Sequence, residues 1–469
     1  MGKVEITIED LFNTPSAEIY NPDAYKSLSS VEIDSRKVKK GSLFVAIKGE
    51  KFDGHDFILD ALKKGAATVI IDSKKFGNPS LREKKFSFIE IPVIIVDDTT
   101  KAFGEIAKIW RNKLSAKVIS ITGSNGKTTV KEMTAALLAE KYKVVKTEAN
   151  NNNHIGVPLT ILSANNKCEV LILEQGTNHF GEIPYSAKIS QPDFSLITNI
   201  GDAHLEFLKS KEGIFREKAA LYDETIKHGG IVFLNMDDPI ISKNAKLYRS
   251  KVTYGFKGTV DVKGTVVGYT EDGRTEIQVS YKNKKIKTVL PLYGESNAKN
   301  FLAASAIALK FGLTGAEIIR GVHNFKAVHG RLEVMKFKNA VLIDDTYNAS
   351  PESVVSAIGL VKKIKTFKKK LIVLGDMYEL GKNSPKIHKE LAKSFYADKN
   401  LTVLTTGSMM KHMHSELQKK KVRSIHFYLR EALSLYLKYE EIDGSVILVK
   451  GSRGMKMEEF SNILEKRFE

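Results

Sequence analysis

The sequence predicts an α/β protein with three domains and mostly parallel sheets. Its 469 residues suffice for about three domains, since one domain usually takes about 100–200 residues. Short apolar runs of strand length alternate with amphipathic segments of helix length, which is the pattern of βαβ units. Several of these runs end at glycine or polar residues. We place the three domains at residues 1–113, 114–328 and 329–469.

The central domain shows the alternation most clearly. Helices are expected over residues 129–141 and 212–224. Strands are expected at 118–122, 143–147, 170–174, 194–198 and 231–234. This order favours a parallel sheet that is covered by helices on both faces.

A different pattern follows between residues 252 and 293. Strand-like segments flank the turn at 271–274, whose Asp272-Gly273 pair is typical of a β-hairpin. We therefore expect a small antiparallel element here. Residues 299–311 then form an expected amphipathic helix that is rich in good helix formers.

Both flanking domains repeat the alternation of the central one. The N-terminal domain is predicted to be a smaller α/β unit, with strands at 42–49 and 68–73. The C-terminal domain is predicted to be a Rossmann-like α/β unit. Its strands are expected at 340–345, 370–376, 401–406 and 445–451.

The composition limits the class of protein. Hydrophobic residues make up 42% of the chain and charged residues 27%, which excludes a mostly disordered chain. A single cysteine excludes a disulfide framework and a cysteine zinc site, and it fits a reducing compartment. The first residues contain no apolar signal-peptide core, and no apolar run approaches the roughly 18 residues of a membrane span. We expect a cytoplasmic protein without stable membrane insertion.

The charge balance points to anionic partners without identifying them. Lys and Arg number 73 against 55 Asp and Glu, a formal net charge of +18. Nucleic acid, a membrane surface and acidic small molecules all fit such a charge. Lysine runs such as 368–370 and 419–421 are typical of solvated surface, and the chain has no RNP, zinc-finger or helix-turn-helix pattern. A nucleic-acid partner is therefore not expected.

The strongest local signal is an apolar strand that runs into a glycine loop and then into a helix. Backbone N–H groups of such a loop face phosphate oxygens, and the helix N-terminus adds a positive dipole. The lysine of the loop can reach the β- and γ-phosphates, and the hydroxyl that follows it can bind Mg²⁺. The spacing G-x-x-G-K-T-T differs from a Walker A motif, because Ile121 stands where the first glycine would be. The predicted P-loop-type ATP site comprises Gly123, Ser124, Asn125, Gly126, Lys127, Thr128 and Thr129.

Three further residues near this loop leave alternatives open when they are judged by pattern alone. Glu174 ends an apolar run, so it is equally a magnesium ligand or a solvated acid at a strand end. His204 stands alone in a loop, where a histidine is more often structural or exposed. Lys218 lies in a helical segment and resembles a surface lysine.

Two polar segments follow other expected strands. The run 150–153 consists of four asparagines, which form either an Asn-rich turn or a ligand-binding loop. The segment 344–348 places two acids, a tyrosine and an asparagine at a strand end, which suits ribose or magnesium contacts. Ser350 and Pro351 fit the N-cap and first position of a helix.

Eight segments spread over the three domains resemble one enzyme family. They are SVEIDSRKVKKGSLFVAIKGEKFDGHDF (30–57), TGSNGKTT (122–129), TEANNNNHIGVPLT (147–160), EQGTNHFGEI (174–183), NIGDAHLEFL (199–208), HGRLE (329–333), DDTYNASP (344–351) and LGDMYELG (374–381). The glycine loop alone also fits the related folylpolyglutamate synthases. Together the segments resemble the Mur ligases of peptidoglycan synthesis, in the branch that adds D-alanyl-D-alanine.

The resemblance implies an ADP-forming peptide ligase. Its substrates would be ATP, UDP-N-acetylmuramoyl-tripeptide and D-alanyl-D-alanine, and its products the UDP-pentapeptide, ADP and phosphate. The tripeptide carboxylate would take the γ-phosphoryl group of ATP, and the dipeptide amine would attack the resulting acyl phosphate. The enzyme would be monomeric. Rival hypotheses are a Mur ligase that adds the third residue, a folylpolyglutamate synthase and a nucleic-acid-dependent ATPase.

The resemblance also implies the metal and catalytic residues. Thr128 and Glu174 would hold one Mg²⁺ and His204 a second. Lys218 would be carbamylated, which makes it a carboxylate-like magnesium ligand. Arg331 would approach the transferring phosphoryl group when the C-terminal domain closes.

Further binding residues follow from the same resemblance. The adenine side would be formed by Asn297 and Asn300, and the ribose side by Asp345, Tyr347 and Asn348. The muramoyl-peptide and metal region would be faced by Asn150, Asn152 and Asn153. The UDP contacts would come from Ser35, Arg36, Lys48 and Gly49. One departure stands out: Ser350 occupies a position where the family often has asparagine.

Overall fold

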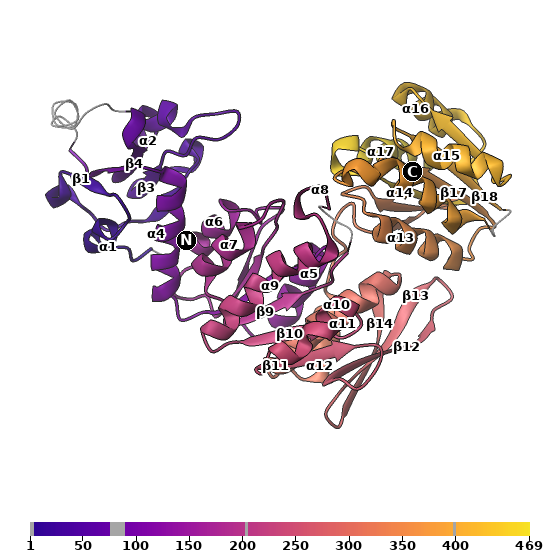
Figure 1. The fold of residues 1–469 in the computed structure, drawn as a ribbon, viewed down its shortest axis with the longest axis horizontal. Helices are drawn as coiled ribbons and strands as arrows, with labels where there is room; N and C mark the ends of the chain where they lie inside the picture. Colours follow the sequence, from indigo (N-terminus) through magenta and orange to yellow (C-terminus); the bar gives the residue numbers. More distant parts are fainter. Residues whose placement is uncertain (1–3, 76–89, 202–204, 397–399) are drawn as a thin grey trace.

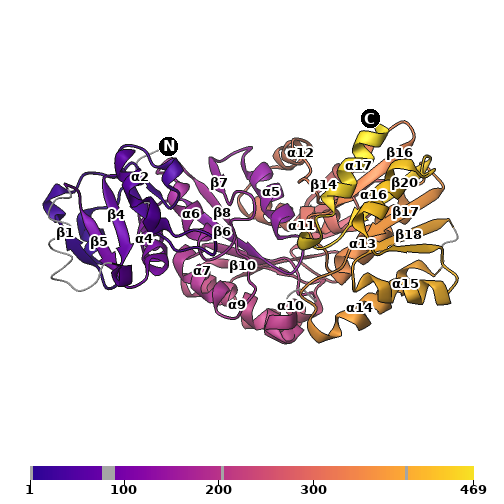
Figure 2. The same ribbon diagram turned by 90° about the horizontal axis from the view of Figure 1, so that it is seen from above.

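Three β-sheets organise the chain, one in each of three domains that follow one another along the molecule (Figures 1 and 2). The computed structural model describes residues 4–75, 90–201, 205–396 and 400–469. Within these ranges no helix is both long enough and apolar enough to cross a lipid bilayer. The predicted α/β class with three domains is confirmed.

The N-terminal domain is built on a five-stranded sheet with the order β1-β5-β4-β3-β2, in which only β1 runs antiparallel to its neighbour. The predicted strands at 42–49 and 68–73 are confirmed as β3 and β4, but β3 ends at Val45 because the chain then folds back through a bridge between Lys48 and Asp53. Its elements are α1 (Ile8–Phe12), β1 (Glu18–Tyr20), β2 (Ser30–Glu32), β3 (Ser42–Val45), α2 (Ile58–Lys63), β4 (Thr68–Asp72), β5 (Val93–Val96) and α4 (Thr99–Lys113).

A single hydrophobic core joins the N-terminal domain to the central one. Apolar side chains of β3, β4, β5 and α4 pack with side chains of α6 (Gly156–Ser163) and β8 (Val170–Glu174) of the central domain. Trp110 of α4 is fully buried in this core, and its indole Nε1 donates a hydrogen bond to the carbonyl of Ala164, 2.9 Å away. These two domains therefore share their interior.

The central domain contains a nine-stranded sheet with the order β14-β13-β12-β11-β10-β9-β6-β8-β7. Its first strands are β6 (Lys117–Thr122), β7 (Val144–Lys146), β8 (Val170–Glu174), β9 (Phe194–Ile197) and β10 (Ile231–Asn235), all parallel. These five confirm the predicted strands. They are continuous apolar runs because helices bury both faces of the sheet.

Two helical layers cover this sheet. On one face α5 (Lys127–Leu138), α11 (Glu295–Lys310) and α12 (Gly315–His323) pack together, and on the other α9 (Lys211–Lys227) covers β9 and β10. The remaining helices are α6 (Gly156–Ser163), α7 (Glu182–Ser190), α8 (Leu205–Leu208) and α10 (Pro239–Asn244). The expected helix at 299–311 begins earlier, at Glu295, directly after Gly294 with its positive φ of 86°.

The predicted antiparallel element at 252–293 is an extension of this sheet. Parallel strand β11 (Lys251–Gly255) is followed by β12 (Val262–Tyr269), β13 (Arg274–Tyr281) and β14 (Lys284–Tyr293), which pair antiparallel with one another. The predicted hairpin turn joins β12 to β13. Gly273 has a φ of +88° there, which explains the Asp-Gly signal.

The C-terminal domain has a six-stranded sheet with the order β15-β16-β20-β17-β18-β19, parallel except for β15. The four predicted strands are confirmed, and β15 and β19 are additional. Ser350 caps α13, as expected. The elements are β15 (Glu333–Lys336), β16 (Ala340–Asp345), α13 (Pro351–Lys363), β17 (Lys369–Leu374), α14 (Ser384–Leu391), β18 (Leu401–Thr406), α15 (Met410–Lys419), β19 (Ser424–Phe427), α16 (Arg430–Tyr439), β20 (Ser445–Lys450) and α17 (Glu458–Phe468).

Polar contacts prevail where the C-terminal domain meets the central one. Lys363 of α13 forms an ion pair with Glu295 of α11 and donates to the Tyr269 hydroxyl, 2.9 Å away. Lys336 of β15 pairs with Asp272 of the β12–β13 turn at 3.0 Å. Partial burial acts to raise the pKa of Asp272, but its bonds with Thr270, Lys336 and Arg274 hold that pKa below its usual value.

The two lysines should hold the domains together in a salt-dependent way. Replacing both Lys336 and Lys363 by Met removes two exposed ion pairs, each of which contributes up to about 1 kcal/mol. We expect a larger radius of gyration for this variant in small-angle X-ray scattering at low salt. Added salt should expand the unmodified chain more than the variant, because it screens the same pairs.

The matched control is Lys389→Met, which removes a lysine that lies 3.8 Å from Glu416 within the C-terminal domain. It should leave the scattering unchanged. Equal radii for the double variant and the unmodified chain would show that these ion pairs do not set the domain arrangement.

Candidate active site

A cleft of about 1020 Å³ lies between the central and C-terminal domains. Loops at the carboxyl ends of β6, β8, β9 and β10 form one wall, and loops after β16, β17 and β20 form the other. In open α/β sheets, ligands bind at this edge. The polar segments that the sequence placed after strands of both domains therefore meet in one cavity.

The glycine loop between β6 and α5 forms the floor of this cleft. Gly123 and Gly126 have φ values of +148° and +82°. A Cβ atom on Gly123 would lie 1.9 Å from the Thr198 hydroxyl oxygen, and one on Gly126 would lie 2.5 Å from Asn300 Oδ1. Only glycine fits these positions, so the strand, loop and helix adopt the local backbone arrangement that the sequence predicts.

Polar side chains from two domains brace the loop at Asn125. The backbone N–H of Asn125 donates to Asn199 Oδ1 at 3.0 Å, and the Thr198 hydroxyl donates to its carbonyl at 2.5 Å. Ser350 of the C-terminal domain donates to Asn125 Oδ1 at 2.9 Å. The pattern identified Ser350 only as a helix cap, and its second contact depends on tertiary structure.

Lys127 begins α5 and folds back over the loop. Its Nζ donates to the carbonyls of Gly123 and Ser124 at 2.7 and 3.3 Å. Burial lowers the pKa of Lys127, and the nearby Arg331 lowers it further, while Glu174 opposes both effects. The loop thus carries a cation at the place where phosphate oxygens would lie.

Glu174 ends β8 beside the loop and is only 2% exposed. Its Oε1 accepts hydrogen bonds from Thr128 Oγ1 at 3.0 Å and Asn152 Nδ2 at 2.9 Å. Its Oε2 is buried without a hydrogen bond among the described residues, 3.7 Å from Lys131 Nζ. Because Glu174 is buried, the alternative that it is a solvated acid at a strand end is wrong. A buried carboxylate oxygen with no donor, next to a hydroxyl, has the chemistry of a magnesium site.

Lys218 lies on the inward face of α9 and is fully buried. Within the described ranges its Nζ has no hydrogen-bond partner. Burial lowers the pKa of Lys218 well below its usual value, and the positive charge of Lys127 lowers it further. The pattern-based expectation of a surface lysine is wrong. The neighbouring Glu217 accepts the N–H groups of Gly181 and Ile183 and so fixes the start of α7.

Arg331 reaches the phosphate loop from the segment that links the two domains. Its Nη2 donates to Thr128 Oγ1 at 3.0 Å, and its guanidinium lies 4.0 Å from the centre of the Tyr347 ring. Its Nε is buried and carries no hydrogen bond within the described part of the chain. Gly330, with φ of +68°, accepts a bond from the Tyr347 N–H and so allows this approach.

Asp345 and Asn348 make contacts within the C-terminal domain. Asp345 Oδ2 accepts from Lys450 Nζ at 2.6 Å, and its Oδ1 accepts from the Leu332 N–H at 3.2 Å. The same ammonium of Lys450 donates to the Asn348 carbonyl at 2.8 Å. Both residues line the cleft. Asp345 therefore anchors the segment that carries Arg331.

The predicted asparagines of the central domain also line the cleft. Asn297 donates to the Tyr293 carbonyl at 2.9 Å, and Asn300 donates to Asn297 Oδ1 at 3.3 Å. Asn153 Oδ1 accepts the N–H of Gly156, the first residue of α6, at 2.8 Å. Asn150 and Asn152 complete the set of asparagines, and Thr129 also lines the cleft.

The predicted UDP contacts lie in the N-terminal domain, away from the cleft. Arg36 is held by Asp34 through bonds of 2.9 and 2.8 Å, and Ser35 is buried. Lys48 and Gly49 belong to the turn after β3. His204 lies outside the described residues.

Several residues of the cleft were not found by sequence reasoning from spacing. Tyr378, Glu379, Ser452 and Arg453 form part of the C-terminal wall. The Tyr378 N–H donates to Ser452 Oγ at 2.8 Å and so joins the two loops. Tyr378 and Glu379 lie in the segment 374–381, which carries part of the family resemblance.

Three family models match successive parts of the chain. Residues 27–111 match the Mur ligase family catalytic domain, residues 121–308 the Mur ligase middle domain, and residues 330–453 the Mur ligase glutamate ligase domain. Together they span most of the sequence.

Two curated relatives are called UDP-N-acetylmuramoyl-tripeptide--D-alanyl-D-alanine ligase. That of Bacillus subtilis is 34% identical over 460 residues and covers 97% of both chains. That of Escherichia coli is 34% identical over 469 residues and covers 99% of both.

Solved structures give the same result. MurF from Acinetobacter baumannii has a TM-score of 0.86 and 27% identity, covering 99% of this chain and 100% of that one. MurF from Thermotoga maritima, solved in complex with ADP, has a TM-score of 0.79 and 29% identity, covering 94% and 97%. A folylpolyglutamate synthase from Mycobacterium tuberculosis shares only the fold, at 16% identity. The chain therefore belongs to the Mur ligase family, in its UDP-N-acetylmuramoyl-tripeptide--D-alanyl-D-alanine ligase branch.

Proposed function

We propose that the chain uses ATP to join D-alanyl-D-alanine to UDP-N-acetylmuramoyl-tripeptide, and releases the UDP-pentapeptide, ADP and phosphate. The contact of Arg331 with the phosphate loop is the observation that carries this proposal. It brings a cation from the linker of the C-terminal domain to the place where a γ-phosphoryl group would be transferred. The curated relatives that span the chain carry the name of this reaction.

The first step joins two anions. The tripeptide carboxylate attacks the γ-phosphorus of ATP, the bond to the β-γ bridging oxygen breaks, and an acyl phosphate and ADP result. Carboxylate and phosphate repel each other, so the step needs positive charge aimed at the transferring group. The loop N–H groups and Lys127 hold the phosphates, and Arg331 neutralises charge from the opposite wall.

The residues that face the loop fit a bound Mg²⁺. Thr128 and Glu174 would hold one Mg²⁺ and His204 a second, and a carbamylated Lys218 would be a further magnesium ligand. The buried oxygen of Glu174 and the buried Nζ of Lys218, both without hydrogen bonds in the described ranges, support this assignment. When bound, Mg²⁺ would neutralise part of the negative charge on the phosphate groups.

Burial prepares Lys218 for carbamylation. Its lowered pKa favours the neutral form of the amine. The neutral nitrogen can attack the carbon of CO₂ and lose a proton, which leaves a negatively charged carbamate. That charge would sit near Lys127, whose positive charge now disfavours the ammonium form of Lys218.

The second step forms the amide bond. The dipeptide amine attacks the acyl carbon, an amide forms, and phosphate leaves.

The binding residues are assigned by substrate. The UDP group is assigned to Ser35, Arg36, Lys48 and Gly49, and the muramoyl-peptide to Asn150, Asn152 and Asn153. Asn297, Asn300, Asp345, Tyr347 and Asn348 are assigned to the nucleoside of ATP. The proposal includes domain limits at 113/114 and 328/329, a monomeric state and a cytoplasmic location.

The substrates can be tested by phosphate release. Phosphate should appear only when ATP, UDP-N-acetylmuramoyl-tripeptide and D-alanyl-D-alanine are all present, because the acyl phosphate must be consumed. The products are identified by mass spectrometry. Nucleic acid should not stimulate turnover. Phosphate release that does not depend on the dipeptide would contradict the proposed reaction.

Lys218→Ala should lower kcat by at least about 100-fold, because the variant lacks a metal-binding carbamate. Short carboxylic acids such as acetate should restore part of the activity by occupying the space left. The exposed Lys227 of the same helix provides the control, since Lys227→Ala should keep normal activity. In the unmodified chain, ¹³C-labelled bicarbonate should give a carbamate signal in NMR spectra. This signal should vanish at low pH, where the amine is protonated.

Near-normal activity of Lys218→Ala, or a missing carbamate signal at neutral pH, would count against this role. The pH direction follows from the lowered pKa. Above that pKa the amine is neutral and reacts with CO₂, and below it the proton blocks the reaction.

Arg331→Met should lower kcat by about 10²- to 10³-fold, the usual effect of removing one preorganised donor from a transition state. ADP affinity, measured by calorimetry, should change much less. Arg320→Met is the control, because this exposed arginine of α12 pairs with Glu140 away from the cleft. A kcat within threefold of the unmodified chain would mean that Arg331 does not act on the phosphoryl group.

A further inference from the structure

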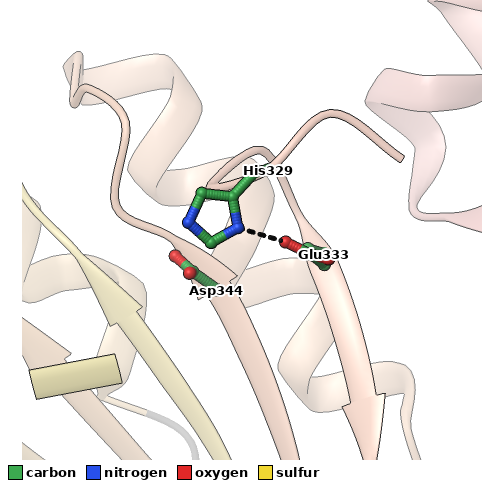
Figure 3. A group of neighbouring side chains, drawn as sticks. All are labelled: His329, Glu333 and Asp344. Atoms are coloured by element: carbon green, nitrogen blue, oxygen red, sulfur yellow. Dashed lines mark hydrogen bonds and ion pairs between the residues drawn. The ribbon is translucent and has the colours of Figure 1, made fainter. Parts of the chain in front are cut away.

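Three side chains converge at the start of the C-terminal domain, outside the residues that line the cleft. His329 precedes β15, Glu333 begins β15, and Asp344 lies near the end of β16. One nitrogen or oxygen atom from each lies within 4.8 Å of the other two (Figure 3). His329 Nδ1 and Glu333 Oε2 are 2.9 Å apart.

The strand register places two negative charges opposite each other. Glu333 and Asp344 are direct partners in the antiparallel pair β15–β16. Like charges directly opposite each other destabilise a sheet. A cation between the two carboxylates would remove this repulsion.

Asp344 is only 1% exposed, and this burial also favours a cation near its carboxylate. Its Oδ1 accepts hydrogen bonds from the Thr346 N–H and hydroxyl, at 3.0 and 2.6 Å. Its Oδ2 has no hydrogen bond to any described residue, and Figure 3 shows this carboxylate beside the His329 ring. A carboxylate group that is nearly buried is costly unless a positive charge compensates it. One oxygen of this carboxylate lies in the cluster.

We propose that His329, Glu333 and Asp344 bind a divalent transition-metal ion of the Zn²⁺ type. One imidazole nitrogen and two carboxylate oxygens suit zinc and its neighbours, whereas Mg²⁺ prefers ligands that are all oxygen. The three protein ligands leave a position for water. The His329 side chain is 76% exposed, so the ion has access from solvent.

This site is distinct from the proposed magnesium site and goes beyond the proposed ligation. Along β16, adjacent residues point to opposite faces. Asp345 therefore faces the cleft and binds Lys450, while Asp344 faces the cluster. Arg331 lies between two of the proposed ligands in sequence. A bound ion would tie His329 to both strands and restrict the segment that presents Arg331.

The test measures Zn²⁺ binding to the full chain in excess Mg²⁺ and ADP, which occupy the phosphate cleft. Competition with a chromophoric chelator gives the affinity. We expect one Zn²⁺ per chain at this site, and His329→Ala should weaken its binding at least about tenfold. Glu333→Gln should weaken it as well. His323→Ala, which removes an exposed histidine bonded to Thr288, should bind as the unmodified chain does.

The Co²⁺ complex provides a second measurement. Its visible absorption should change between the unmodified chain and His329→Ala, because an imidazole ligand is lost. His329 is exposed, so its replacement should leave the fold intact, which circular dichroism checks. Equal Zn²⁺ affinity for the unmodified chain and His329→Ala would overturn the proposal, and so would the absence of saturable Zn²⁺ binding. Both results are independent of ligase activity.

Discussion

Arg331 meets Thr128 across the boundary between two domains, and the organisation of the cleft depends on this contact. Thr128 in turn donates to Glu174, so one chain of contacts leads from the linker through the phosphate loop to the end of β8. Behind Arg331, Gly330 and Tyr347 fix the backbone and the plane of the guanidinium. The two groups that react first in a ligase of this family, a carboxylate and a γ-phosphate, are both anionic. Their approach requires cations whose positions are fixed in advance by both domains.

The positive charge of the chain is divided between a solvated surface and a few buried lysines. Lys131, Lys370 and Lys450 are buried, and each donates to carbonyl or carboxylate oxygens. Lys218 is buried as well, yet its Nζ has no hydrogen bond to any described residue. Burial without a hydrogen-bond partner disfavours an ammonium group there and lowers the pKa of Lys218, which favours the neutral, nucleophilic amine. The net charge of +18 thus says less about partners than the few lysines that lie inside.

The sequence predicted the central strands well because each is a continuous apolar run buried on both faces, as for Val170–Leu173. It missed β1, β2, β15 and β19, which have three or four residues each and are only partly buried. It also missed β5, which is buried but has only four residues. The phosphate loop was predictable because its glycines are required by local backbone geometry. The burial of Lys218 was not, because α9 presents it to the interior only after the sheet has formed. The bond between Ser350 and Asn125 joins residues 225 positions apart, which no local pattern can show.

The shared core around Trp110 distinguishes one domain boundary from the other. Apolar packing fuses the N-terminal and central domains, whereas ion pairs and hydrogen bonds prevail between the central and C-terminal domains. The first two domains therefore form one rigid unit of fixed length. In the proposed assignment the UDP group lies at one end and the γ-phosphate at the other, so that only a peptide of the right length would place its terminal carboxylate at the phosphorus. Selection for a tripeptide would then be a property of the distance between two rigidly joined domains, set by an indole far from any reacting atom.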